Sequence, residues 1–258
     1  MKKKLKFLLL PTVAIVLSLF NFPLAFARRG THNSKAPSAV MTSAATPKSI
    51  GSEWISNAVS FLYDSLDLET AGLNRQAFDF ALAGWNHLVD ANKLSHPDIL
   101  AIADFTQPSN KKRLFVLDLR NARLLYQTLV AHGRNSGKLW ATAFSNKLSS
   151  YKSSPGFYVT GDTYNGSNGY SLKLTGVEAG INDKALKRAI VMHGADYVDE
   201  STISSLGYLG RSQGCPAVPV KEARNIINTL KDGACLYIHT ADKNYVSRSS
   251  LLSDSSGS

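Results

Sequence analysis

Residues 113–131 read RLFVLDLRNARLLYQTLVA and form two apolar runs with a short polar break at residues 120–122. Both runs are rich in aliphatic and aromatic side chains, which are typical of β-strands, and the break has the length of a turn. Shorter runs of the same kind lie at residues 156–160, 170–174, 189–193 and 234–239. The sequence therefore predicts a body made mainly of β-strands.

Helical patterns stand before and inside this body. Apolar residues recur at helical spacing between residues 53 and 91, where Asn74 is placed to cap a helix. Another helix is predicted over residues 219–230, with Pro219 at its first turn and Gly233 after its end. Because helices do not alternate regularly with strands, the expected fold class is β-rich α+β with a short N-terminal helical segment.

Composition limits the chemistry that the chain can perform. Of its 258 residues, 44% are hydrophobic and 19% charged, which is enough apolar material for a core. Two cysteines exclude a disulfide-dense fold and a four-cysteine zinc site, and the sequence has no H-E-x-x-H motif, P-loop or dinucleotide-binding glycine motif. The formal net charge of +10 comes without an arginine-rich run interleaved with aromatics. We therefore expect no cofactor, no metal and no nucleic-acid partner.

The first residues predict export. A basic start at residues 2–6 precedes an apolar run and a small-residue site ending at Ala27, which is the pattern of a cleaved signal peptide. The apolar run is shorter than the roughly 20 residues that span a bilayer, although an uncleaved anchor stays an alternative. The expected location is the periplasm or the cell envelope. The expected organisation is a signal peptide (1–27), a flexible leader (28–52), a helical segment (53–95), a catalytic domain (96–241) and a disordered tail (242–258).

Two short motifs carry the candidate chemistry. His193 and Gly194 end an apolar run, and residues 210–217, GRSQGCPA, form a loop of mostly small residues before the predicted 219–230 helix. A thiol needs a base or a positive partner to become a thiolate near neutral pH, and a histidine at a strand end can supply it. Glycine before Cys215 lets the backbone turn tightly, so that N–H groups there can hold an oxyanion. The sequence predicts Cys215 as nucleophile and His193 as base.

Each of these residues also has an ordinary structural interpretation, as a small buried cysteine or a hydrogen-bonded core histidine. The glycine-containing loop favours a catalytic role for Cys215, whereas Cys235 lies in an apolar run and is interpreted as a packing residue. A disulfide between Cys215 and Cys235 stays open in an oxidising compartment, although it would consume the nucleophile.

The ordered motifs resemble those of a known family. Residues 154–160 (SPGFYVT), 193–198 (HGADYV) and 210–217 (GRSQGCPA), together with 130–133 (VAHG), are similar to the L,D-transpeptidases of peptidoglycan, the YkuD-type catalytic domain. The similarity is greater to the branch described as the murein L,D-transpeptidase catalytic domain family, and it covers residues 60–240. It implies a YkuD-like mixed β-sandwich with inserted helices.

The resemblance also implies a reaction. Cys215 would attack the carbonyl of the third residue of a tetrapeptide stem, with loss of the terminal D-Ala, and an amine of another stem would resolve the thioester into a 3→3 cross-link. His193 would be the general base, and the N–H groups of Gly214 and Cys215 would hold the oxyanion. The candidates for substrate binding or for orienting the catalytic pair are Ser212, Arg211, Gln213, Gly194 and His132.

Two alternative functions stay open. One forms the same acyl-enzyme and resolves it differently, and the other forms no acyl-enzyme. With water as acceptor the protein would be an L,D-carboxypeptidase, and a non-catalytic wall-binding module is a further alternative. A sortase or a papain-like peptidase fits less well, because the first places a threonine-containing strand before its cysteine and the second places cysteine before histidine. The expected partners are peptidoglycan stem peptides, with carbapenem-type β-lactams as covalent inhibitors.

Overall fold

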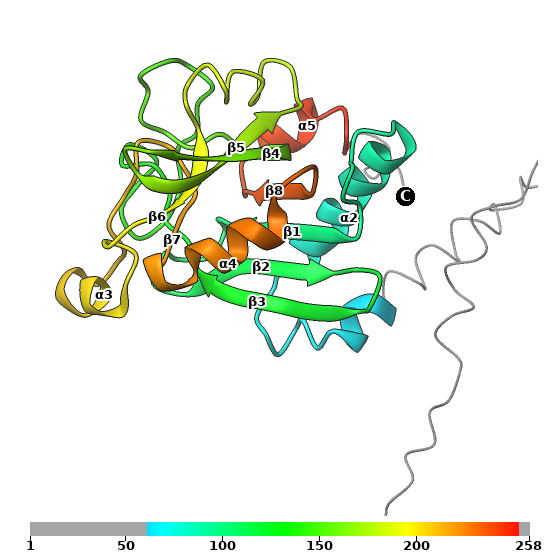
Figure 1. Ribbon diagram of the computed structural model, residues 1–258, viewed down its shortest axis with the longest axis horizontal. Helices are drawn as coiled ribbons and strands as arrows, with labels where there is room; N and C mark the ends of the chain where they lie inside the picture. The colour runs from blue at the N-terminus through cyan, green and yellow to red at the C-terminus, as the bar shows by residue number, and fades with distance from the viewer. Residues whose placement is uncertain (1–60, 253–258) are drawn as a thin grey trace, which may run out of the picture. The chain divides into compact units, whose positions relative to one another are not determined.

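The computed structural model of the chain describes residues 61–252 (Figure 1). The predicted signal peptide, the leader and the start of the helical segment lie outside the described residues. The helices with both ends described are α2 (Arg75–Asp90), α3 (Glu200–Leu206), α4 (Val220–Leu230) and α5 (Lys243–Arg248). The strands are β1 (Ile99–Asp104), β2 (Lys112–Asp118), β3 (Arg123–Leu129), β4 (Gly156–Gly166), β5 (Gly169–Gly176), β6 (Val191–Gly194), β7 (Ala217–Val218) and β8 (Cys235–His239).

These strands form one mixed sheet in the order β3-β2-β1-β8-β4-β5-β6-β7. Strand β1 runs parallel to β8, as β6 does to β7, and the other neighbouring pairs are antiparallel. Just beyond β3, the N–H of Ala131 donates to the carbonyl of Ala217 in β7 at 2.8 Å, so the two ends of the sheet meet. The predicted β-rich α+β class is confirmed.

The two larger of the three apolar cores found in residues 61–252 lie on opposite faces of the sheet. Alternate residues of a strand point to opposite faces, and in β1 Ala101 and Ala103 belong to one core while Leu100 and Ile102 belong to the other. Helix α4 fills the first core, and α2 and α5 contribute buried residues to the second. Because both faces are covered there, β1 and β8 are buried along their whole length, whereas β4 becomes exposed in its second half.

Helix α2 begins where the sequence predicts. The side chain of Asn74 accepts hydrogen bonds from the N–H groups of Gln76 and Ala77, at 2.8 and 3.2 Å, and a cap of this kind stabilises a helix by about 1 kcal/mol. The helix buries Phe78, Leu82 and Leu88 against the second core. The described part of the N-terminal helical segment, from residue 61 on, thus packs in the same core as the sheet.

The predicted disordered tail over residues 242–258 is wrong for the part that the structure describes. Residues 243–248 form α5, and Tyr245 and Leu252 are buried in the second core. The hydroxyl of Ser249 donates to the carboxylate of Glu178 at 2.5 Å, which fixes the segment to the body. The many serines suggested a solvated tail, but one serine with a buried acceptor and two apolar anchors are sufficient to order it.

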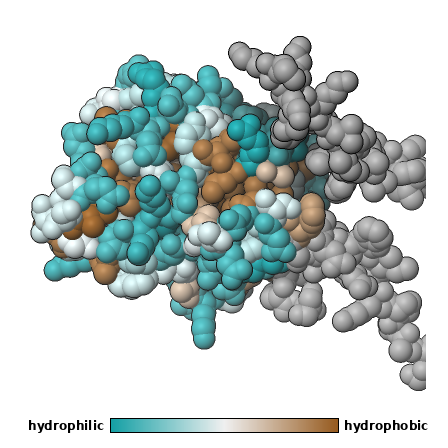
Figure 2. All heavy atoms as spheres, turned by 90° about the horizontal axis from the view of Figure 1, so that it is seen from below, coloured by the Kyte–Doolittle hydropathy of each residue, from teal (hydrophilic) through white to brown (hydrophobic). Residues whose placement is uncertain are grey.

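The surface of the described part is mixed in polarity. On the face shown in Figure 2 hydrophilic residues surround scattered apolar ones. Within residues 61–252, no helix has the length and the apolar character needed to cross a membrane.

Candidate active site

Strand pairing brings the two predicted motifs together. In the parallel pairing of β6 with β7, His193 lies opposite Ala217, and Gly194 lies opposite Val218. Because the pairing is parallel and Cys215 precedes Ala217 by two residues, Cys215 lies level with Val191 at the start of β6, two residues from His193 along that strand. The topology therefore places the thiol and the imidazole in one region although 21 residues separate them in the sequence.

A network of hydrogen bonds fixes the Cys215 loop. The hydroxyl of Ser212 donates to the carbonyl of Cys215 at 2.6 Å and accepts from the N–H of Gly214 at 3.0 Å. From outside the loop, the hydroxyl of Ser153 donates to the carbonyl of Gly214 at 3.0 Å. Gly214 has a φ of 124°, and a Cβ there would lie 2.7 Å from the carbonyl oxygen of Lys152, so only glycine fits.

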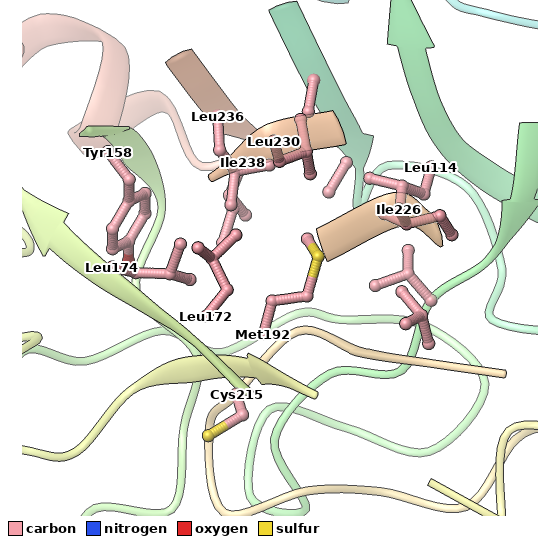
Figure 3. Packing of buried hydrophobic residues seen from close by; sticks show 14 of the residues in the cluster. Leu114, Tyr158, Leu172, Leu174, Met192, Cys215, Ile226, Leu230, Leu236 and Ile238 are labelled. Carbon is pink, nitrogen blue, oxygen red and sulfur yellow. The ribbon is translucent and has the colours of Figure 1, made fainter. Parts of the chain in front are cut away.

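The Cys215 thiol lies at the edge of the first core. Figure 3 places its side chain away from the aliphatic residues around Met192, at the end of a loop. The residue is 7% exposed, and Sγ donates to the carbonyl of Ala189 at 3.7 Å. Burial raises the pKa of this thiol, and the positive charge of Arg188 acts against that rise. Cys235, by contrast, is fully buried in β8 on the other face, where burial also raises the pKa of its thiol.

The imidazole of His193 has one ring nitrogen engaged. Its Nδ1 lies 3.0 Å from the carbonyl of Gly194, so a proton on Nδ1 leaves Nε2 as the basic nitrogen. Burial lowers the pKa of His193, which keeps the ring neutral at physiological pH. Among the hydrogen bonds of residues 61–252, none joins His193 to Cys215. Its role as a base therefore stays a prediction.

The ring of His132, in the second His-Gly pair, is buried and, within residues 61–252, makes no hydrogen bond to Cys215. Its Nδ1 accepts a hydrogen bond from Nη2 of the buried Arg113 at 2.8 Å, and its Nε2 lies 3.3 Å from the carbonyl of Gly137. Its carbonyl accepts from the N–H of Ser212 at 3.0 Å. Its backbone therefore braces the Cys215 loop, while its ring belongs to a separate buried cluster. A substrate contact by His132 stays a prediction.

Acidification is expected to destabilise the protein through His132. Burial and the adjacent Arg113 lower the pKa of His132 to about 4, whereas an unfolded chain has a histidine pKa of about 6.5. Between these values the unfolded state binds more protons, so the free energy of unfolding decreases as the pH falls, by up to about 3 kcal/mol. Urea unfolding of wild type and of His132→Asn at several pH values from 7.5 to 4 measures this contribution.

Asparagine keeps an acceptor for Arg113 but does not titrate, so the variant should lose less stability than the wild type on acidification. Other buried titratable groups, such as Glu178, whose pKa burial raises, are the same in both proteins, so their contributions cancel in the difference. Equal pH dependence in the two proteins would contradict the prediction.

The remaining predicted residues have different surroundings. Nη1 of Arg211 donates to the carbonyls of Arg134 and Gly137, each at 3.1 Å, and its guanidinium lies 5.6 Å from the Tyr208 ring centroid. Gln213 is exposed on the Cys215 loop. Gly194 lies against α4, where a Cβ would come within 2.9 Å of the Ala223 side chain. Substrate roles for these residues stay predictions, and Gly194 has a packing role in addition.

Sequence reasoning missed three residues at this site. Ser153 donates a hydrogen bond to the carbonyl of Gly214, and the charge of Arg188 interacts with that of Cys215. Burial, and to a smaller extent the charge of Cys215, raise the pKa of Tyr197 to about 12. All three come from loops between strands; Ser153 and Arg188 belong to no quoted motif, and Tyr197 lies within the 193–198 motif but was not selected as a site residue. The one signal in the sequence was the serine-rich stretch 145–154, which is typical of backbone-binding hydroxyls.

Other parts of the described chain show no competing metal centre. Within residues 61–252, no cluster of three or more His, Cys, Asp or Glu side chains is suitable for a metal ion. A cavity of about 470 Å³ is lined by residues that include Tyr63, Asp104 and Trp140, and it contains neither Cys215 nor His193. This cavity is therefore not formed by the two predicted motifs.

Comparison with protein families agrees with the motifs. A family model described as "L,D-transpeptidase catalytic domain" matches residues 69–239. This range begins before α2, ends with β8, and includes both His193 and Cys215. None of the curated proteins matches the chain.

Solved structures with a similar arrangement include L,D-transpeptidases. An L,D-transpeptidase from Mycobacterium smegmatis is 12% identical, with a TM-score of 0.35 over 55% of this chain and 59% of that one. L,D-transpeptidase 3 from Mycobacterium tuberculosis is 12% identical, with a TM-score of 0.36 over 55% of this chain and 61% of that one. The structure of L,D-transpeptidase 3 from M. tuberculosis with a faropenem-derived adduct is 12% identical, with a TM-score of 0.35 over 55% of this chain and 60% of that one. The chain thus spans about three-fifths of the length of these structures.

Proposed function

This chain belongs to the L,D-transpeptidase catalytic domain family, and we propose that it is an exported cysteine transpeptidase that acts on peptidoglycan tetrapeptide stems. The observation that carries the proposal is the β6–β7 register, which sets His193 opposite a residue two positions beyond Cys215. A thiol and an imidazole at one edge of the sheet are what nucleophilic acyl transfer needs. Export to the periplasm or cell envelope is supported by the pattern of residues 1–27.

The proposed reaction has an acylation step and a transfer step. In the first, Nε2 of His193 takes the thiol proton, and Sγ of Cys215 attacks the carbonyl carbon of the third stem residue. The C–S bond forms, the C–N bond to D-Ala breaks, and the imidazolium returns the proton to the leaving amine. In the second, His193 deprotonates an acceptor amine, whose nitrogen displaces the sulfur and gives a 3→3 cross-link.

The oxyanion of the acylation step needs N–H donors near the thiol. In the structure the N–H of Gly214 donates to Ser212 Oγ, so the N–H of Cys215 is the better candidate of the two that we proposed. Use of the Gly214 N–H would require that bond to break. Ser212 would then act by shaping the loop, since its hydroxyl is bonded to the carbonyl of Cys215.

Two other functions share part of this site. An L,D-carboxypeptidase would form the same thioester and resolve it with water, giving a trimmed tripeptide. A non-catalytic wall-binding module would need the fold without the thiol chemistry, and the presence of both His193 and Cys215 favours an enzyme. Carbapenem-type β-lactams are proposed covalent inhibitors, because their strained amide offers the thiol an activated carbonyl.

The proposed function is tested with protein lacking residues 1–27 and a disaccharide-tetrapeptide. Mass spectrometry is expected to show release of D-Ala together with a dimer linked 3→3, and an added D-amino acid should appear at the stem terminus in place of D-Ala. Tripeptide as the sole product, at every acceptor concentration, would identify the carboxypeptidase instead. Absence of D-Ala release would leave only the wall-binding module.

A further inference from the structure

Arg188 connects the two segments that enclose Cys215. It lies in the loop between β5 and β6, is half-buried, and reaches across to the long connection between β3 and β4. There Nη1 donates to the carbonyl of Ser145 at 2.8 Å and to the hydroxyl of Ser154 at 2.5 Å. Nη2 donates to the hydroxyl of Ser150 at 3.2 Å and to the carbonyl of Lys152 at 2.5 Å. One guanidinium therefore fixes residues 145–154 at four points.

The same guanidinium borders the Cys215 loop. A Cβ built on Gly214 would lie 3.1 Å from Nη2 of Arg188, so the guanidinium and the loop backbone are in close contact. The next residue in the chain, Ala189, provides the carbonyl that accepts from Sγ of Cys215 at 3.7 Å. Residues 188 and 189 thus touch both the glycine before the nucleophile and the nucleophile itself.

The charge of Arg188 has no carboxylate partner in the described chain. The ion pairs found within residues 61–252 join other cations, and the four acceptors of Arg188 are carbonyl and hydroxyl oxygens. A guanidinium held by neutral acceptors keeps its full positive charge, and in a half-buried position water screens that charge less than at the surface. Two neighbouring groups can form an anion beside it, the phenol of Tyr158 and the thiol of Cys215, and of these only the thiol belongs to the proposed catalytic pair.

We propose that Arg188 is a positioning residue for the acylation step: it clamps residues 145–154 against the Cys215 loop and stabilises the Cys215 thiolate by its uncompensated charge. This proposal deepens the proposed function and rests on it. Burial raises the pKa of the Cys215 thiol, and the backbone of Val191 and the charge of Arg188 both act to lower it, so the guanidinium opposes the effect of burial. His193 would then accept the proton, and Arg188 would make the anion left behind more stable.

The test measures the ionisation of Cys215 without any substrate. Alkylation by iodoacetamide is followed across pH 5–10 in the wild type and in Arg188→Met, and peptide mapping separates Cys215 from the buried Cys235. We expect the midpoint of the Cys215 profile to rise by about one pH unit in Arg188→Met, which lowers alkylation about tenfold at pH 7. Arg188→Lys keeps the charge and should restore most of the midpoint. Lys187→Met, at an exposed neighbouring cation, is the matched control and should leave the midpoint unchanged.

A merely structural role would change the melting temperature but not this midpoint. A folded Arg188→Met protein with the wild-type midpoint would overturn the proposal. If that variant does not fold, Arg188→Gln, which keeps amide donors for the carbonyls of Ser145 and Lys152, takes its place. Failure of both neutral variants to fold would assign Arg188 to the framework alone and would also overturn the proposal. Because the readout is thiol alkylation, it is independent of whether the wild type releases D-Ala.

Discussion

Replacing Cys215 with alanine is expected to lower the rate of D-Ala release from tetrapeptide stems by at least about 10³-fold, because acyl transfer loses its nucleophile. The fold should survive the change. The thiol makes one weak hydrogen bond, to the carbonyl of Ala189 at 3.7 Å, and the carbonyl of Cys215 keeps its bond from Ser212. The rate is measured by mass spectrometry at saturating substrate, and circular dichroism confirms that the variant is folded.

Cys235→Ala is the matched control for this experiment. Cys235 is fully buried in β8, on the opposite face of the sheet from the core that includes Cys215. Removing its sulfur should reduce the free energy of unfolding by about 1 kcal/mol and leave the rate per folded molecule near that of the wild type. Full activity in Cys215→Ala, or a comparable loss in Cys235→Ala, would show that the nucleophile is assigned wrongly.

The strands and the two motifs could be predicted because their signals are local. The run at residues 113–119 and the helix over residues 219–230 both match elements of the structure, β2 and α4, to within about a residue. The motifs around His193 and Cys215 predicted a base and a nucleophile. The sequence alone, however, does not show that β6 and β7 are adjacent and parallel. That adjacency depends on pairing between strands that are distant in the chain.

A short surface helix and the parts held by long-range contacts escaped prediction. Helix α3 has no buried residue and is defined by its ends, the Asp199 cap and Gly207 in a left-handed conformation at φ 80°. Helix α5 depends on Glu178, which is 71 residues before Ser249 in the chain. Arg188 is one of several cations in its loop, and its acceptors lie 34 to 43 residues earlier. No spacing rule on a single sequence distinguishes such a residue from a surface arginine.

Replacing His193 with glutamine is expected to lower the acylation rate at pH 7 by about 10² to 10⁴-fold and to change the shape of its pH profile. In the wild type, burial lowers the pKa of His193, and only the neutral ring can accept the thiol proton. The rate should therefore fall at acid pH, where the imidazole becomes protonated, and the midpoint of this acidic limb should lie below the ordinary histidine pKa of about 6.5. In the variant the rate should follow ionisation of the thiol, whose pKa burial raises, and so increase with pH through the alkaline range.

The measurement is kcat/KM for D-Ala release between pH 4.5 and 9.5, which reports the groups that titrate in the free enzyme. His96→Gln is the control: this residue precedes β1, belongs to neither motif, and should leave the acidic limb in place. Glutamine has a similar size to histidine but does not titrate, so loss of the limb in His193→Gln alone would assign it to the imidazole. A limb that persisted in His193→Gln would mean that another group sets it. In that case the pairing of His193 with Cys215, which we infer from the register of β6 and β7, would be wrong.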